Sequence, residues 1–206
     1  EGGFGKTIRF LKNIMGLWLV QECRRSFKRD GESYTYDELT RLAESSPSLE
    51  MFVDPDARDF LSPPDMPEAI RAFCQRTGQA LPQGVGPLVR CCLESLALKY
   101  RWTVERLKMI TGRQFQVLHI VGGGIQNELL CQLAANATGL PVLAGPVEAT
   151  AVGNILMQAI ALGVIASIEE GREIVQKSFP VKEYLPQDKA VWDEAYGRFC
   201  NLVQEV

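Results

Sequence analysis

The sequence predicts an α/β domain in which short buried strands alternate with helices. Two apolar runs, residues 116–121 and 141–145, each lead through glycine into a segment with helical periodicity. Strands that alternate with helices in this way are typical of layered α/β domains. A length of 206 residues and a hydrophobic content of 46% are enough to bury an ordinary core.

The composition argues against nucleic-acid and membrane partners. The formal charge is -3, from 22 basic and 25 acidic residues, and the small basic clusters at 24–25 and 28–29 are interpreted as a solvated helix face. No apolar run approaches the roughly 18 to 20 residues that span a bilayer, and the first residues lack a signal-peptide profile. We therefore expect a cytoplasmic protein.

Six cysteines occur singly or side by side within apolar or helical stretches, without any CxxC pair, and the chain has one histidine. A zinc site is therefore not expected, and the thiols are interpreted as reduced and buried. Cys74 and Cys91 flank a short loop between two helical stretches, so a disulfide between them is a second hypothesis. The six positions are Cys23, Cys74, Cys91, Cys92, Cys131 and Cys200.

The first elements are an extended segment and two amphipathic helices. Residues 8–11 have a strand-like pattern, and a helix with one buried stripe is expected to follow near Met15. Thr35 is predicted as an N-cap with Glu38 three residues later, which forms a capping box, and this helix should end before Pro47. The buried stripe of the first helix comprises Leu17, Val20, Cys23 and Phe27.

An ordered loop and a long helix come next. Residues 51–67 hold four prolines and four aspartates, which predicts a loop whose acidic side chains are solvated. Asp65 is expected to cap a helix that ends at Gly78. Residues 86–110 have overlapping apolar faces before Gly112, which predicts a long and mostly buried helix.

The second half begins with the clearest strand, residues 116–121, which contains His119. This histidine is interpreted as packed in the core. Asn127 is predicted to cap a helix that ends at Gly139, before the second strand at 141–145.

Three helices complete the predicted domain. Residues 147–163 form a helix rich in small residues, which permits a close approach between backbones. Residues 167–178 and 187–206 are predicted as two amphipathic helices.

The three glycines Gly122–Gly124 either form a ligand site or only turn the chain. A strand, a glycine turn and a helix N-terminus present backbone amides and a helix dipole that suit a nucleotide or phosphate, although a plain turn is the alternative. The spacing is neither the Walker nor the dinucleotide pattern. Gly145 and Gly153 mark a second strand-to-helix passage, so the two passages can wall one cleft. Glu148 there either compensates the helix dipole or contacts the ligand.

No nucleophile is paired with a base anywhere in the sequence. The chain is therefore interpreted as a ligand-holding lobe whose chemistry lies elsewhere. No catalytic residue and no metal ligand is predicted within it.

The segment "HIVGGGIQNELLCQLAANATGLPVLAGPVEATAVGN", together with "LKNIMGLWLVQE", resembles the FGGY carbohydrate kinases. These sugar kinases have the actin-like, ribonuclease H-like ATPase fold, and the resemblance covers residues 1 to about 187. Many members carry Ala and Ser after the glycines and a Trp before the Gln, where this chain has Ile125, Asn127 and Leu130 before Gln132. The Gln-Asn form is similar to the rhamnulokinase branch of the family.

The resemblance implies that residues 1–206 are the second, C-terminal lobe of a two-lobed kinase. The N-terminal catalytic lobe and the first strands of the second lobe are expected upstream. Gly123 resembles the glycine that lies against the nucleotide, and Gly122 and Gly124 shape that backbone. Gln21 resembles a residue facing the nucleotide, and Asn13 one facing the sugar and the cleft; a capping Asn and an exposed helical Gln are the alternatives.

The resemblance further implies a parent kinase that uses ATP and Mg²⁺ to convert L-rhamnulose into L-rhamnulose 1-phosphate. This chain alone is expected to be inactive, because the catalytic aspartate and the first phosphate loop belong to the missing lobe. Another ketose kinase, such as an L-fuculokinase or a xylulokinase, is the alternative within the class. A non-catalytic actin-fold nucleotide-binding module and a structural oligomerisation domain are alternatives outside it.

Overall fold

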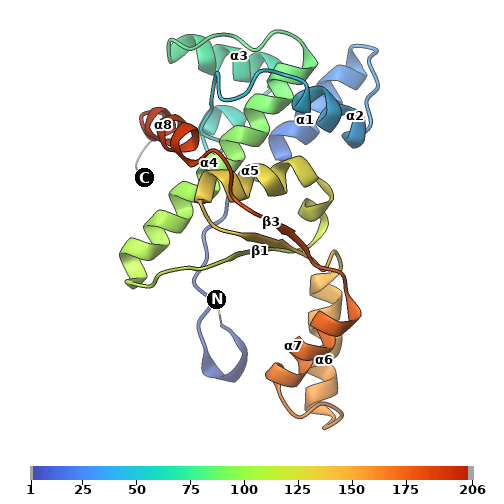
Figure 1. The fold of residues 1–206 in the computed structure, drawn as a ribbon. Helices are drawn as coiled ribbons and strands as arrows, with labels where there is room; N and C mark the ends of the chain where they lie inside the picture. Colours follow the sequence, from blue (N-terminus) through green and yellow to red (C-terminus); the bar gives the residue numbers. More distant parts are fainter. Residues whose placement is uncertain (1, 204–206) are drawn as a thin grey trace.

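The computed structural model describes residues 2–203. Helices gather at one end of the molecule, a small sheet lies in the middle, and the α6–α7 pair projects from the other end (Figure 1). The elements in chain order are η1 Phe4–Lys6, α1 Trp18–Arg29, α2 Tyr36–Glu44, η2 Arg58–Phe60, α3 Met66–Arg76, α4 Val85–Thr111, β1 Leu118–Ile120, η3 Gly123–Gln126, α5 Glu128–Thr138, β2 Val142–Ala144, α6 Ala149–Ala161, α7 Ile168–Ser178, β3 Lys182–Tyr184 and α8 Lys189–Cys200.

The helix boundaries of the first half follow local signals. The N–H of Glu38 donates to Thr35 Oγ1 (3.2 Å) and the N–H of Thr35 to Glu38 Oε2 (2.7 Å), so the predicted capping box of α2 is confirmed. Asp65 caps α3 as predicted, because its Oδ1 accepts from the N–H of Glu68 at 2.8 Å. Helix α1 begins later than expected, since Gly16 has a left-handed backbone with φ +62°.

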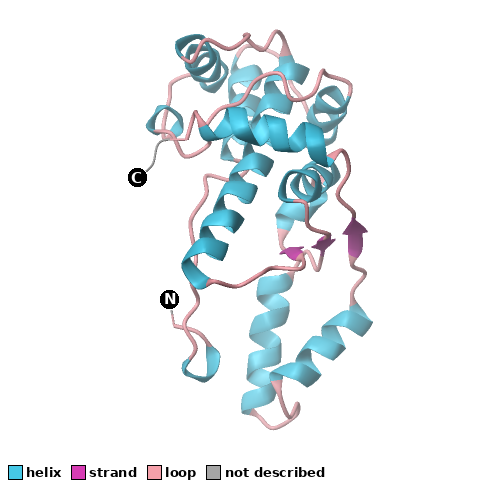
Figure 2. Cartoon of the chain, turned by 60° about the vertical axis from the view of Figure 1, so that its left-hand side comes forward, coloured by secondary structure: helices cyan, strands magenta, loops and turns pink. Residues whose placement is uncertain are grey.

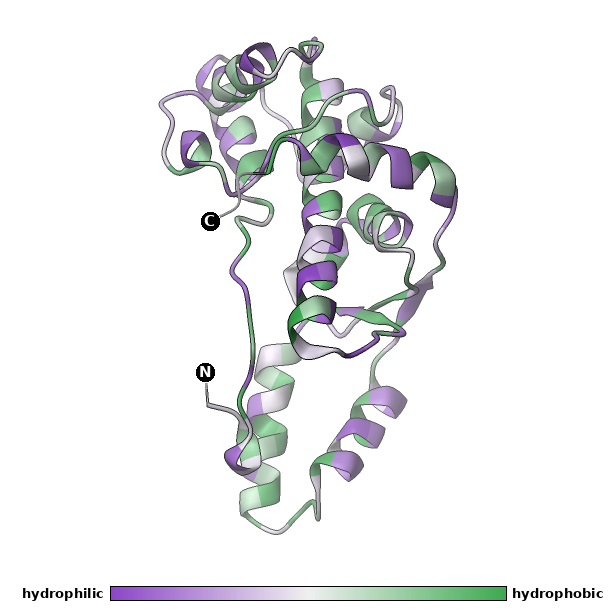
Figure 3. Ribbon diagram, turned by 90° about the vertical axis from the view of Figure 1, so that its left-hand side faces the viewer, coloured by the Kyte–Doolittle hydropathy of each residue, from purple (hydrophilic) through white to green (hydrophobic). Residues whose placement is uncertain are grey.

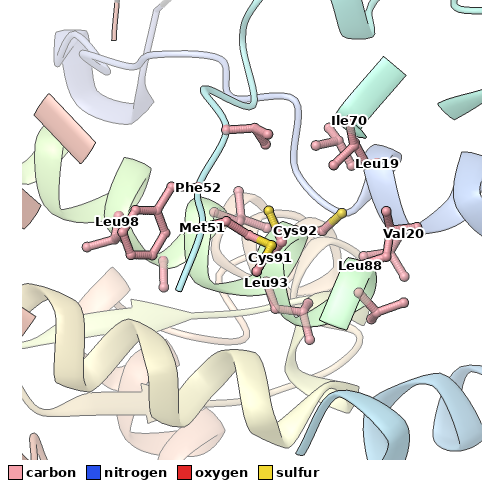
Figure 4. Packing of buried hydrophobic residues seen from close by; sticks show 14 of the residues in the cluster. Leu19, Val20, Met51, Phe52, Ile70, Leu88, Cys91, Cys92, Leu93 and Leu98 are labelled. Atoms are coloured by element: carbon pink, nitrogen blue, oxygen red, sulfur yellow. The ribbon is translucent and has the colours of Figure 1, made fainter. Parts of the chain in front are cut away.

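Helix α4 is the central element, and it packs against α1, α2, α5 and α8. Its predicted end is confirmed, since Gly112 adopts a left-handed C-cap with φ +66°. Figure 4 shows apolar side chains from several segments meeting around this helix. They include Leu19 and Val20 of α1, Met51 and Phe52 of the loop after α2, Ile70 of α3, and Leu88, Cys91, Cys92, Leu93 and Leu98 of α4.

The proline-rich loop is ordered, as predicted, and it is buried more deeply than its aspartates suggest. Phe52 and Phe60 are fully buried, and the N–H of Val53 donates to Ser95 Oγ on α4 at 2.9 Å. The expectation of solvated acids is wrong for Asp54, which is 5% exposed and pairs with the buried Lys99. A buried cation on a facing helix leaves no local trace in the loop sequence.

The sheet has three short strands in the order β1-β2-β3. Strand β1 pairs parallel to β2, and β3 pairs antiparallel to β2, so that Val142 of β2 lies between Leu118 and Tyr184. Figure 2 shows these strands between the upper helices and the α6–α7 pair. His119 is exposed on β1, an edge strand of the described sheet, so the prediction of a packed core histidine is wrong.

The strand-like segment 8–11 does not join this sheet. Among the described residues it makes one isolated bridge, between Ile8 and Gly2, and Ile8 is 84% exposed. Of the two expectations, a strand or an extended segment, the structure shows the extended segment, because an alternating pattern supplies a suitable face but no partner edge. In Figure 1 the segment runs as an arm beside the body of the molecule.

Helices α6 and α7 pack mainly on each other. Figure 3 shows that α6 is largely apolar and α7 largely polar. The expected close approach through the small residues of α6 is not seen, since none of its described side chains is buried. The close contact instead involves Gly171 of α7, which faces Leu156. The last predicted helix ends at Cys200, and its expected continuation over 204–206 lies outside the described residues.

Five cysteines are buried, as interpreted from the sequence, whereas Cys200 is exposed. Cys74 and Cys91 come together as the sequence suggests, but as free thiols that share a hydrogen bond. That hydrogen bond, followed by burial, raises the pKa of the Cys91 thiol well above its usual value. In the described part of the chain, no helix is long and apolar enough to cross a membrane.

Candidate functional site

A pocket of about 380 Å³ lies between α1, α2, the start of α4 and the glycine turn after β1. This volume is within the range of roughly 300 to 1,000 Å³ that is typical of small-molecule sites. The residues that line it are Leu17, Val20, Gln21, Tyr36, Asp37, Leu39, Thr40, Val89, Gly123, Gly124, Gln126 and Asn127.

Three of the five predicted site residues line this one pocket. Gln21 of α1 meets Gly123 and Gly124 there, although they are far apart in the sequence. Gly122 directly precedes the wall that these glycines form. Asn13 is not among the lining residues; it is exposed in the segment that leads to Leu17 and α1.

The consecutive glycines have different structural roles. Gly122 has φ +81° and ψ -168°, a conformation that residues with side chains rarely adopt, so it makes the turn. Gly123 and Gly124 have no such φ, and a Cβ built on either would have no described atom within 4 Å. Neither backbone conformation nor crowding therefore requires glycine at these two positions, which face the pocket.

Two amides of the glycine turn, those of Gly122 and Ile125, have acceptors within the protein. The N–H of Gly122 donates to Pro146 O (3.1 Å), and that of Ile125 to Gly122 O (3.2 Å). The first turn of α5 is capped by Asn127, whose Oδ1 accepts from the N–H of Leu130 at 2.8 Å. The glycine turn thus forms a pocket wall, and the start of α5 is already capped.

A hydrogen-bond chain ties this wall to α2. Asn127 Nδ2 donates to Thr40 Oγ1 (3.3 Å), and Thr40 Oγ1 donates to Tyr36 O (2.9 Å). Both side chains line the pocket. Sequence reasoning missed the α2 wall because Tyr36 and Thr40 occupy ordinary surface positions of an amphipathic helix. In the structure the Tyr36 ring is half-exposed, which the sequence alone does not indicate.

The pocket carries little charge. Among the described residues that line it, Asp37 has the one formal charge, and no lysine or arginine is present. The Arg24 guanidinium lies 4.7 Å from the centre of the Tyr36 ring and donates through Nε to Tyr34 O at 2.6 Å, which holds the ring at the rim. Amides, a hydroxyl and an aromatic edge suit a planar, uncharged polar group better than a phosphate.

The second strand-to-helix passage adjoins the first, but the expectation that both wall one cleft is wrong, because no described residue of the second passage lines the pocket. The Gly122–Pro146 hydrogen bond joins them, and Gly145 returns one from its N–H to Ile120 O at 2.9 Å. Glu148 and Gly153 do not line the pocket, and Glu148 is exposed at the N-cap of α6. The second passage therefore contacts the glycine turn through Pro146 without forming part of the pocket lining.

A second hollow, of about 320 Å³, lies between α4 and α8. Its aromatic rings already have cationic partners, since Arg106 lies 5.0 Å from the ring centre of Trp102 and Arg101 lies 4.1 Å from that of Tyr196. None of the predicted site residues lines it. The pocket at the glycine turn is therefore the candidate site.

Curated relatives of this chain are rhamnulokinases. The chain is 45% identical over 204 residues to the rhamnulokinase of Bacteroides thetaiotaomicron, covering 99% of this chain and 41% of that protein. It is 45% identical over 186 residues to the rhamnulokinase of Enterococcus faecalis, covering 89% and 37%. The chain thus spans about two fifths of the length of these relatives.

Solved kinases share the fold. A xylulose kinase from Rhodospirillum rubrum matches with a TM-score of 0.62 and 24% identity, over 90% of this chain and 36% of that one. A Plasmodium falciparum glycerol kinase with ADP matches with a TM-score of 0.60 and 16% identity, over 91% and 38%. The model of the FGGY family of carbohydrate kinases, C-terminal domain, matches residues 1–162. The chain therefore belongs to the FGGY family of carbohydrate kinases and corresponds to its C-terminal domain.

Proposed function

We propose that the full-length parent of this chain is a rhamnulokinase, which transfers a phosphoryl group from ATP to the 1-hydroxyl of L-rhamnulose with Mg²⁺. Residues 1–206 would be its C-terminal lobe and would hold the nucleotide. The family and the identity of 45% to named rhamnulokinases support this proposal.

One observation carries the nucleotide site: Gly123 and Gly124 lack side chains where neither conformation nor packing requires it. Both face a pocket of suitable size, together with the amide of Gln21. A flat ligand that lies against this backbone would explain why both positions are glycine, because a side chain at either position would occupy the space of the ligand.

The lining residues fit the adenosine part of ATP. The base and ribose need apolar contact and a few hydrogen-bonding groups, which Val20, Gln21 and Gln126 can provide. Phosphoryl transfer also requires charge neutralisation around the phosphates, which Mg²⁺ supplies when it is bound. With no basic side chain among the described lining residues, we expect the remaining neutralisation and the catalytic base to come from the N-terminal lobe.

The role proposed for this lobe is positioning. A two-lobed clamp brings the γ-phosphate and the sugar hydroxyl into line and excludes water, which favours transfer over hydrolysis. Asn13 is exposed in the segment that precedes the pocket-lining Leu17, and we propose that it faces the sugar across the cleft.

Calorimetric titration with ADP and Mg²⁺ tests the nucleotide site. We expect saturable binding to this chain, loss of binding in Gly123→Asp, and a similar affinity for adenosine and ADP because the pocket lacks basic side chains. Gly197→Asp is the control, since Gly197 is exposed on α8 away from the pocket. Equal binding by Gly123→Asp and the wild type would refute the assignment.

The sugar is tested separately in the full-length protein with a panel of L-rhamnulose, L-fuculose and D-xylulose. Preferential phosphorylation of L-rhamnulose supports the proposal, and preference for another ketose identifies a different kinase of the family. ADP binding without phosphorylation of any sugar would favour a non-catalytic nucleotide-binding module.

A further inference from the structure

The segment that carries Asn13 is clamped onto the proline-rich loop. Asp56 holds the segment on both sides of Asn13: its Oδ1 accepts from the N–H of Met15 (3.0 Å), and its Oδ2 lies 3.4 Å from Lys12 Nζ. Further along, Trp18 Nε1 donates to Phe60 O at 3.0 Å. The chain from 12 to 18 is thus fixed to one loop about forty residues away in sequence.

The clamp has a buried anchor in α4. Lys99 is 3% exposed, and its Nζ lies 2.7 Å from Asp54 Oδ1 and 3.3 Å from Asp56 Oδ2. Asp54 Oδ1 also accepts from the N–H of Asp56 at 3.2 Å, which orients the second carboxylate toward the segment. Two aspartates and two lysines therefore form one network between the core and the segment.

Such a network is poorly explained by stability alone. Replacing a buried ion pair with well-packed apolar residues is often neutral or stabilising, so the buried pair is weak evidence for stability and leaves room for a role in fixing geometry. Asp56 Oδ2 is buried and accepts no hydrogen bond from the described residues, so the charges of Lys12 and Lys99 are what stabilise it there. This oxygen directly links the core cation to the segment.

We propose that Asp56 is a positioning residue, which acts through Met15 and Lys12 to fix the direction in which Asn13 faces the cleft. The inference rests on the proposed function, because it assumes that Asn13 contacts the sugar. Asp56 itself does not line the nucleotide pocket. The network should therefore influence sugar use without changing nucleotide affinity.

A double-mutant cycle in the full-length kinase tests this inference, with Asn13→Ala, Asp56→Asn and the double variant. We expect Asp56→Asn to lower kcat/KM for the sugar about tenfold, since a misplacement near 1 Å can reduce rates up to roughly a hundredfold. The double variant should be no worse than Asn13→Ala, because Asp56 acts through Asn13. ADP affinity should stay within about twofold of the wild type.

Asp59→Asn is the matched control, because Asp59 lies in the same loop but pairs with Arg76 (2.9 Å) on α3 and not with the segment. Lys12→Gln removes the other partner of the Lys12–Asp56 ion pair. Because the Lys12 side chain is 43% exposed, this variant should fold even if Asp56→Asn does not. It should lower kcat/KM in the same non-additive way.

Additive losses, or an equal loss of ADP affinity, would overturn the positioning role. If Asn13→Ala leaves sugar kinetics unchanged, the sugar-facing role of Asn13 and this inference both fail. The nucleotide site at Gly123 would then still stand on its own titration, so the two failures are distinguishable.

Discussion

Replacing Gly86 with alanine should destabilise the contact between α2 and α4, which builds one corner of the candidate pocket. Gly86 is in the first turn of α4, and a Cβ there would lie 2.6 Å from the carbonyl oxygen of Leu42 on α2 and would also clash with Ser46 Oγ. The first of these is a backbone atom, so the helix itself must move. Overpacking of this kind costs about 1–3 kcal/mol.

The opposing effect is small. Alanine is favoured over glycine within helices by about 1 kcal/mol, and less near a helix start. We therefore expect a net loss of roughly 1–2 kcal/mol, which lowers the Tm of a domain of this size by roughly 2–8 °C. Because α2 carries Tyr36, Asp37 and Thr40 into the pocket, ADP affinity should fall as well.

Gly197→Ala in α8 is the matched control for both measurements. Gly197 is also helical, but a Cβ there would have no described atom within 4 Å, so alanine should be neutral or slightly stabilising. Thermal unfolding and ADP calorimetry of this chain check the pair. The same Tm for Gly86→Ala and Gly197→Ala would refute the proposed close packing of α2 on α4.

Three further outcomes are expected. The pKa of the Glu38 carboxyl is lowered, chiefly by the hydrogen bond from the N-cap backbone, so its stabilising effect is present at neutral pH and is lost as the pH falls through this lowered pKa; Glu38→Gln should be less stable than the wild type at pH 7, with a difference in Tm that shrinks as the pH falls below the ordinary glutamate pKa of about 4.3 and through the lowered one. Thr40→Val removes the hydrogen bond from Asn127 and should weaken ADP binding about 2–10-fold in calorimetry, whereas Thr103→Val, which loses only a hydroxyl bond within α4, should not. Cys200 should be the first thiol to react with a thiol reagent in the native protein, and preferential labelling of any buried cysteine, followed by mass spectrometry, would contradict the described burial.

Features determined within a few residues could be predicted from the sequence. The capping residues Thr35, Asp65 and Asn127 and the C-cap Gly112 were correct, because each acts on backbone groups of its own helix. The long central helix was also predicted correctly, because its apolar faces are encoded along one continuous stretch, but the expectation that it is mostly buried holds only as far as Lys99.

Features that depend on distant partners could not be predicted. Strand β3 is three residues long with two exposed side chains, and its pairing with β2 defines it more than its composition does. The segment 8–11 has a better pattern and forms no strand. Asp54 was taken for a solvated loop residue because Lys99, which neutralises it, lies 45 residues away.

The candidate site likewise combines a feature that is determined locally with features that depend on distant partners. The glycine turn was visible locally, but its meeting with Gln21 was expected only through the family resemblance. The α2 wall was missed, because Tyr36 and Thr40 become pocket residues only when Asn127 ties the turn to that helix. A single side-chain hydrogen bond between segments 87 residues apart gives no periodic signal in either of them.

The low charge of the pocket fits the proposed division of roles, in which this lobe holds the nucleotide and the other lobe carries the charged groups. A site that bound the phosphates tightly by itself would stabilise ATP in the open and closed states alike, and uniform binding of this kind does not accelerate transfer. Under the proposed function, walls of glycine backbone, amides and one ring would instead hold the adenosine end of the nucleotide, which does not react. The network through Asp56 fixes the segment proposed to face the other substrate, and this segment leads directly into the start of α1, where Gln21 lines the pocket. Closure against a second lobe that carries the charges would then be the event that aligns them.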